Sequence, residues 1–114
     1  MIRKAALAIF SLLTLNPGCV FAGGSGGVLI QTLGLDNGAA PNVLFISVDS
    51  PKSNPPSCQI NGGWAYVLPL ASDQNKKIYA MLLTARASHA PVTLVGTGAC
   101  DVFSGIETLQ VVYY

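Results

Sequence analysis

Hydrophobic residues recur along this chain in three patterns, and each pattern predicts a different kind of segment. The first is a mostly apolar run, Ala5–Leu15, which follows two basic residues and stops at Asn16-Pro17. The second is a set of short stretches rich in valine, isoleucine and aromatic residues, which is typical of buried β-strands. The third is a single stretch with helical spacing. Together they predict a leader followed by a β-rich domain.

The apolar run and its flanks predict a secretory signal peptide over residues 1–22. The run is shorter than the roughly 20 residues that a membrane-spanning helix needs. Val20-Phe21-Ala22 then supplies small residues at the −3 and −1 positions of a cleavage site. Cleavage after Ala22 would leave residues 23–114 as a single domain, secreted or periplasmic. Lipidation at Cys19 is the alternative use of the same segment.

Five stretches of the remaining chain are predicted to be strands. A glycine-rich leader over residues 23–27 is expected to be flexible. Asp36-Asn37-Gly38 is a strong turn signal, and the prolines of residues 50–57 predict a loop. The predicted strands are residues 28–35, 42–48, 64–70, 92–97 and 108–114.

One segment between the third and fourth predicted strands has the spacing of an amphipathic helix. Ser72 or Asp73 is suited to cap its start, and Pro91 stops it. The apolar positions recur at intervals of three and four residues, which places them on one buried stripe. These positions are Ile78, Met81, Leu82 and Ala85.

This order of elements predicts an OB-fold-like domain. Three strands, one helix and two strands in about ninety residues match a five-stranded Greek-key barrel with its helix between strands three and four. An α+β sandwich with the same order of elements is the competing architecture.

Two cysteines lie in the predicted domain, and they are expected to pair. An exported chain folds in an oxidising compartment, and a domain this small needs a covalent tie. A Cys58–Cys100 disulfide would close a loop of about forty residues and contribute roughly 3–4.5 kcal/mol. Two free buried thiols are the alternative.

Charge and composition exclude several classes of function. The chain has six basic and five acidic residues. Removal of the leader takes away Arg3 and Lys4, so four basic and five acidic residues remain and the net charge of the domain is −1. No basic patch is present, so nucleic-acid binding has no electrostatic basis. No cysteine or histidine cluster has metal-ligand spacing, so no metal or cofactor is expected. No second apolar span follows the leader, so no membrane span is expected.

Residues suited to catalysis are few, and the chain is predicted not to be an enzyme. The best acidic pair is Asp101 and Glu107, at the two ends of a turn. Paired carboxylates can hydrolyse glycosides, but such enzymes also need a cleft. The favoured interpretation is that Asp101 bonds turn amides and that Glu107 is solvated or bonded to backbone. His89, beside Pro91 at the end of the helix, is expected to be a surface cap.

Aromatic residues offer better candidates for binding. Trp64 and Tyr66 are two residues apart on the third predicted strand, so they are expected to share one face. They form either a core pair or a stacking platform for a sugar.

The last predicted strand is apolar on both faces. Leu109, Val111 and Tyr113 are expected on one face, with Val112 and Tyr114 on the other. Because so small a domain cannot bury both faces, this strand predicts self-association.

The block 80–107 contains LLTARAS, followed by VGTGACD and a downstream Glu-Thr. On this block above all, and over most of residues 23–114, the chain resembles small exported bacterial proteins related to the B subunits of subtilase-cytotoxin and pertussis-like toxins. The resemblance implies an OB-fold that assembles into a ring and binds glycans. It also implies a sugar contact at a serine before the first strand, for which Ser25 is the match.

These observations favour a secreted, non-enzymatic binding module. Its expected ligand is a glycan or a glycoprotein surface, bound by several sites displayed on a homo-oligomer. A catalytic partner subunit is a possible companion of this assembly. The expected ligand-binding residues are Ser25, Trp64, Tyr66 and Asp101. The alternative is a periplasmic inhibitor or accessory subunit that binds another protein.

Overall fold

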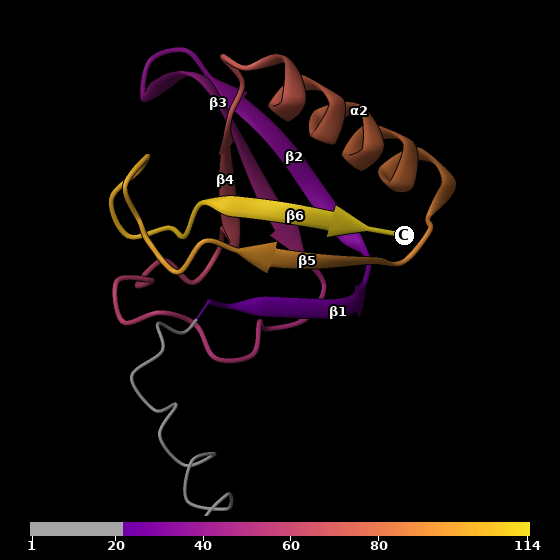
Figure 1. The fold of residues 1–114 in the computed structure, drawn as a ribbon, viewed down its shortest axis with the longest axis horizontal. Helices are drawn as coiled ribbons and strands as arrows, with labels where there is room; N and C mark the ends of the chain where they lie inside the picture. The colour runs from indigo at the N-terminus through magenta and orange to yellow at the C-terminus, as the bar shows by residue number, and fades with distance from the viewer. Residues whose placement is uncertain (1–21) are drawn as a thin grey trace, which may run out of the picture.

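The computed structural model describes residues 22–114, which form six strands and one helix (Figure 1). The predicted signal peptide lies outside the described residues, apart from Ala22 at its end. In chain order the elements are β1 Gly24–Val28, β2 Ile30–Asp36, β3 Ala40–Val48, β4 Tyr66–Pro69, α2 Asp73–Ser88, β5 Val92–Gly96 and β6 Leu109–Tyr113.

The strands form two antiparallel sheets of three strands each, in the orders β1-β5-β6 and β2-β3-β4. The sheets meet where β4 approaches the start of β6: Val67 and Thr108 form an isolated parallel bridge. There the Val67 amide donates to the Glu107 carbonyl at 3.0 Å. The expectation of one closed five-stranded barrel is therefore corrected to two sheets with six strands. The helix does lie between the third and fourth predicted strands, as expected.

The extra strand comes from the glycine-rich segment that was expected to be flexible. Gly24 and Ser25 of β1 pair with Val95 and Leu94 of β5. Gly24 also exchanges two backbone hydrogen bonds with Ser53, at 3.0 and 2.7 Å. Backbone pairing of this kind needs no hydrophobic side chains, so the sequence pattern does not reveal it. The predicted strand over residues 28–35 is thus divided between β1 and β2.

The helix begins and ends as the sequence predicts. The Ser72 hydroxyl accepts a hydrogen bond from the Asn75 amide at 3.1 Å, which caps the first turn. His89 ends the helix in a left-handed conformation with a φ of 55°. Of the predicted stripe, Ile78, Leu82 and Ala85 are buried. They lie in the main hydrophobic core together with residues of both sheets.

The faces of β6 differ from the prediction. The register pairs Leu109 with Gly96 but Val111 with Val95, so β6 contains an extra residue at this point. This bulge turns the strand: Leu109 and Val112 both pack in the main core. Val111 therefore lies on the outer face, next to Val95, because neighbouring residues of a strand alternate in direction.

Between residues 22 and 114, the structure contains no helix with the length and apolar character needed to span a bilayer.

Candidate functional site

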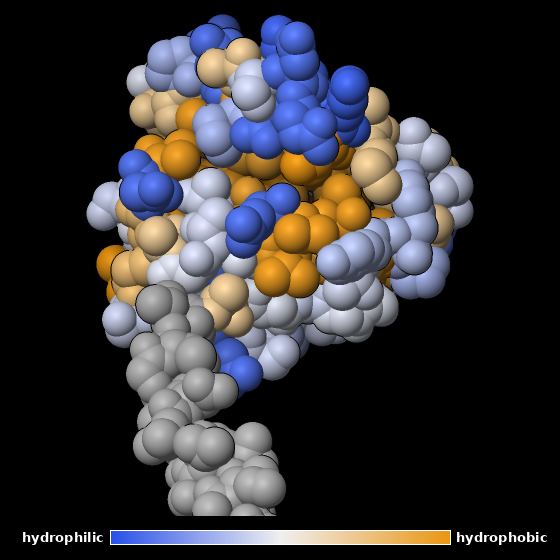
Figure 2. Space-filling view, in the orientation of Figure 1, coloured by the Kyte–Doolittle hydropathy of each residue, from blue (hydrophilic) through white to orange (hydrophobic). Residues whose placement is uncertain are grey.

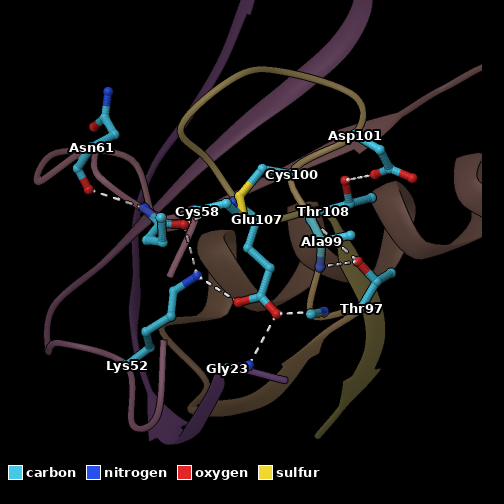
Figure 3. Close-up of a disulfide and its surroundings, with 12 residues drawn as sticks. Gly23, Lys52, Cys58, Asn61, Thr97, Ala99, Cys100, Asp101, Glu107 and Thr108 are labelled. Carbon is cyan, nitrogen blue, oxygen red and sulfur yellow. Dashed lines mark hydrogen bonds and ion pairs between the residues drawn. A yellow bond between two sulfur atoms is a disulfide. The ribbon is translucent and has the colours of Figure 1, made fainter. Parts of the chain in front are cut away.

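The predicted disulfide is present. Cys58 and Cys100 are bonded, with their Cα atoms 6.0 Å apart and a sequence separation of 42 residues. The bond joins the proline-rich loop to the segment that follows β5 (Figure 3). It thereby fixes the two parts of the chain that surround the charged residues described next.

A buried ion pair lies beside the disulfide. The Lys52 ammonium is 3.0 Å from Oε1 of Glu107, and the two side chains are 5% and 0% exposed. Lys52 comes from the proline-rich loop, and Glu107 immediately precedes the bridge between β4 and β6. Two opposite charges withdrawn from water in this way need further hydrogen bonds to be stable.

Backbone amides supply those hydrogen bonds to Glu107. Oε2 accepts from the amides of Gly23 and Gly98 at 2.9 and 2.8 Å (Figure 3). A Cβ atom at Gly23 or Gly96 would overlap the carboxylate, so glycine is required at both positions. The expectation that Glu107 bonds to backbone is confirmed, and the expectation that it is solvated is wrong.

The Lys52 ammonium is held on several sides. Besides Glu107, it donates to Oε1 of Gln59 at 3.2 Å and to the Ala65 carbonyl. It lies 3.8 Å from the centre of the Tyr66 ring, in a cation–π arrangement. Burial lowers the pKa of Lys52, while the hydrogen bond and charge of Glu107 oppose that shift.

Tyr66 and Ser25, two of the predicted ligand-binding residues, lie together but inside the protein. Tyr66 is 0% exposed and Ser25 is 3% exposed. Their hydroxyl oxygens are 3.0 Å apart and share a hydrogen bond. Burial, helped by the charge of Glu107, raises the pKa of Tyr66 to about 12, and the hydrogen bond from Ser25 opposes the rise. The phenol is therefore neutral at physiological pH.

Trp64 lies apart from Tyr66, so the two rings do not form one face. Trp64 packs in a second hydrophobic cluster, where its ring centre is 5.6 Å from that of Phe45. Phe103 meets Phe45 edge-on at 5.1 Å between ring centres. Trp64 lies two residues before Tyr66, the first residue of β4. Because Trp64 is outside the strand, the alternation of side chains along a strand does not apply to it.

The three aromatic rings border a surface hollow of about 430 Å³. Its wall is mainly apolar, and Asp36 and Asn61 bring polar groups to it. A second hollow of about 390 Å³, which reaches Lys52 and Gln59, shares Asn61 and Trp64 with the first. The remaining residues around the first hollow are Gly34, Leu35, Ala39 and Ile106.

Asn61 shapes the loop between the two hollows. Its Oδ1 accepts hydrogen bonds from the amides of Gly63 and Trp64, both at 2.8 Å. These two hydrogen bonds fix the backbone of residues 61–64 and thereby the position of Trp64.

Asp101, the fourth predicted ligand-binding residue, is exposed and lies outside both hollows. Its Oδ1 accepts a hydrogen bond from the Thr108 hydroxyl at 2.9 Å. The side chains of Asp101 and Glu107 point in different directions (Figure 3). Both carboxylate oxygens of Glu107 are held by internal donors, so the pair does not present two carboxylates to a common space.

The sequence did not single out Lys52, Gln59 or Asn61. Lys52 and Asn61 stand in segments that read as ordinary loops. One feature of the sequence does point to the Glu107 site. Gly96 and Gly98 stand shortly before Cys100, and closely spaced glycines often mark a place where the backbone approaches another group closely.

Comparison of the chain with protein-family models, with curated proteins and with solved structures found no match. Over residues 22–114, the structure defines a disulfide-bonded, β-rich domain with one helix and a buried ion pair.

Proposed function

We propose that this protein is a secreted, non-enzymatic carbohydrate-binding module, and that its ligand binds in the hollow bordered by Trp64. The observation that carries the proposal is the grouping of Trp64, Phe45 and Phe103 around one open hollow. Aromatic walls with a few polar groups are typical of small-ligand sites. The C–H faces of a sugar ring can stack on the indole.

The polar groups at the hollow suit hydroxyl-bearing ligands. Asn61 uses Oδ1 to hold its own loop, and its Nδ2 donates no hydrogen bond to another residue among 22–114, where the side chain is exposed. That amide is then available to a sugar hydroxyl, as is Oδ2 of Asp36 at the end of β2, whose Oδ1 already accepts hydrogen bonds from the amides of Gly38 and Ala39. Ser25 and Tyr66 take a different role from the one expected, because both are too buried to touch a ligand. The Tyr66 ring lies against the Lys52 ammonium, and Ser25 shares a hydrogen bond with the Tyr66 hydroxyl.

The strand pairings support an OB-fold for this module. Only Leu29 separates β1 from β2, so the two can be regarded as one bent strand that pairs with β5 and then with β3. The parallel bridge between Val67 and Thr108 links the third and last strands of such a fold. OB-folds bind oligosaccharides in several families.

A glycan array tests the binding proposal. The exported, oxidised protein is expected to bind one sugar class reproducibly, and Trp64→Ala is expected to reduce binding by about five- to thirtyfold, since a stacked ring contributes on the order of 1–2 kcal/mol. Leu83→Ala, which removes an exposed apolar side chain of α2 outside both the hollow and the β6 edge, is the matched control and should bind normally. A blank array from folded protein would reject carbohydrate and favour a protein partner, for which the 82% exposed Ile60 beside the loop is the first contact to replace.

We also propose that the module binds its ligand as a homo-oligomer, with β6 at the subunit contact. β6 lies at the edge of its sheet, and Val111 stands beside Val95 on the outer face. Figure 2 shows hydrophobic side chains gathered over β5 and β6 on this side of the molecule. Tyr113 and Tyr114 extend the same end of the strand and are 56% and 59% exposed. Repeated weak sites on one assembly would gain avidity.

Sedimentation of the purified protein measures this association directly. Val111→Lys is expected to shift the assembly to monomer, because it places a charge in an apolar contact. Leu83→Lys, at an exposed apolar position of α2, should leave the assembly unchanged. A wild-type protein that sediments as a monomer at micromolar concentration would reject the contact.

A further inference from the structure

The nitrogen atom of Gly23 occupies an unusual position. It lies 2.9 Å from Oε2 of Glu107, in a buried hydrogen bond between residues 84 positions apart. Gly23 is buried, whereas Ala22 next to it is exposed. The chain therefore passes from the surface to the buried carboxylate within one peptide unit.

This nitrogen is also the atom that signal-peptide cleavage would release. Cleavage after Ala22, at Val20-Phe21-Ala22, converts the Gly23 amide nitrogen into an α-amino group. We propose that this processing step creates a buried ion pair between the α-ammonium of Gly23 and Glu107, so that removal of the leader completes the charge network. The proposal rests on the expected cleavage site and is independent of carbohydrate binding.

The geometry around Glu107 suits a second cation. Oε1 receives the Lys52 ammonium, and Oε2, on the other side of the carboxylate, receives Gly23 together with the Gly98 amide. A hydrogen bond between two ions is stronger than one from a neutral amide. An ammonium at Gly23 would therefore strengthen a bond that is already formed, without moving either partner.

The surroundings of Gly23 fit a chain that begins there. A side chain at this position would overlap the Glu107 carboxylate, so only glycine brings its nitrogen this close. Because Ala22 is exposed, its removal opens no internal gap. The extra hydrogen atoms of the ammonium can face the solvent that Ala22 now contacts.

The ion pair has a definite pH signature. Glu107 favours the protonated amine and the nearby Lys52 ammonium opposes it, while the Tyr66 phenol is neutral in this range. Burial of Gly23 lowers the pKa of the α-amine, whereas direct contact with the Glu107 carboxylate raises it. We expect the contact to outweigh burial, so that this pKa lies above its ordinary value of about 7.7–8.0. The added stability is then fully present below about pH 7.7 and is lost as the pH rises through the raised pKa.

The test compares two exported forms of the full chain. One has the native leader; in the other, a Gly-Ser dipeptide is inserted after Ala22, so that the Gly23 nitrogen stays an amide after cleavage. Intact mass shows where each mature chain begins. At pH 7, the native mature form is expected to have a folding equilibrium constant about tenfold larger, equivalent to a shift of about one unit in the pKa of the amine. The difference should vanish above about pH 10, and the contributions of Lys52 and Tyr66 cancel because both forms contain them.

Glu107→Gln, introduced into both forms, is the control that removes the carboxylate charge. The dipeptide should then make no difference, because the amide cannot form an ion pair. If these variants do not fold, direct titration of the α-amine of the native mature form replaces them: a pKa at or below about 8 overturns the proposal. A mature chain that begins at any residue other than Gly23, or equal stability of the two forms at pH 7, overturns it as well. None of these results affects the glycan array.

Discussion

Replacement of Lys52 by methionine is expected to lower the free energy of unfolding by about 3–5 kcal/mol, the range found when one partner of a buried ion pair is removed. Methionine keeps much of the apolar stem that lies over the Tyr66 ring. It removes the charge, however, and leaves the Glu107 carboxylate, which is 0% exposed, with backbone amides as its remaining partners. Urea unfolding at pH 7 measures the change.

Lys77→Met is the matched control for this prediction. Lys77 is exposed on α2, and a surface substitution of this kind should change stability by no more than about 0.5 kcal/mol. A loss below about 1 kcal/mol for Lys52→Met would mean that water or a rearranged loop replaces the lost partner of the Glu107 carboxylate. That result would contradict a fixed, buried ion pair.

Loss of the disulfide is the second large effect we expect. The double variant Cys58→Ala, Cys100→Ala should lose roughly 3–4.5 kcal/mol, because the bond no longer restricts the unfolded chain. The loss should lie at the upper end of this range, since Cys58 is followed by Gln59, whose Oε1 accepts hydrogen bonds from the Lys52 ammonium and the Glu107 amide. Releasing this loop weakens the ion pair as well as the chain closure.

Urea unfolding with and without a reductant checks this result. Reductant should destabilise the wild-type protein by a similar amount and should leave the double variant unchanged. Equal midpoints for oxidised and reduced wild-type protein would show that the loop is held by its hydrogen bonds alone.

The parts of the fold that depend on side-chain pattern could be predicted from the sequence. The helix has a buried stripe, a serine cap and a proline beyond its end, and all three act within a few residues. β1 could not be predicted in this way, since Gly24 and Ser25 pair through backbone groups with a strand about 70 positions further on. The bulge in β6 was missed for a related reason, because register depends on the partner strand rather than on local alternation.

The charged residues show the same division between local and distant causes. Cys58 and Cys100 could be paired because only two cysteines lie in the expected mature domain. The burial of Glu107 could not be foreseen, because it results from the meeting of Lys52, Gly23 and Gly98, which come from three separate segments. A carboxylate in a turn is usually solvated, and only tertiary structure shows the exception.

The pairing of β1 with β5, and of Gly23 with Glu107, also bears on when this protein can fold. These contacts join the start of the domain to its last residues, and contacts so distant in sequence slow folding. A growing chain cannot complete its core until almost all of it has been synthesised. Such a chain cannot reach its complete fold before its synthesis is nearly finished, and an incompletely folded polypeptide can still be threaded through a narrow channel.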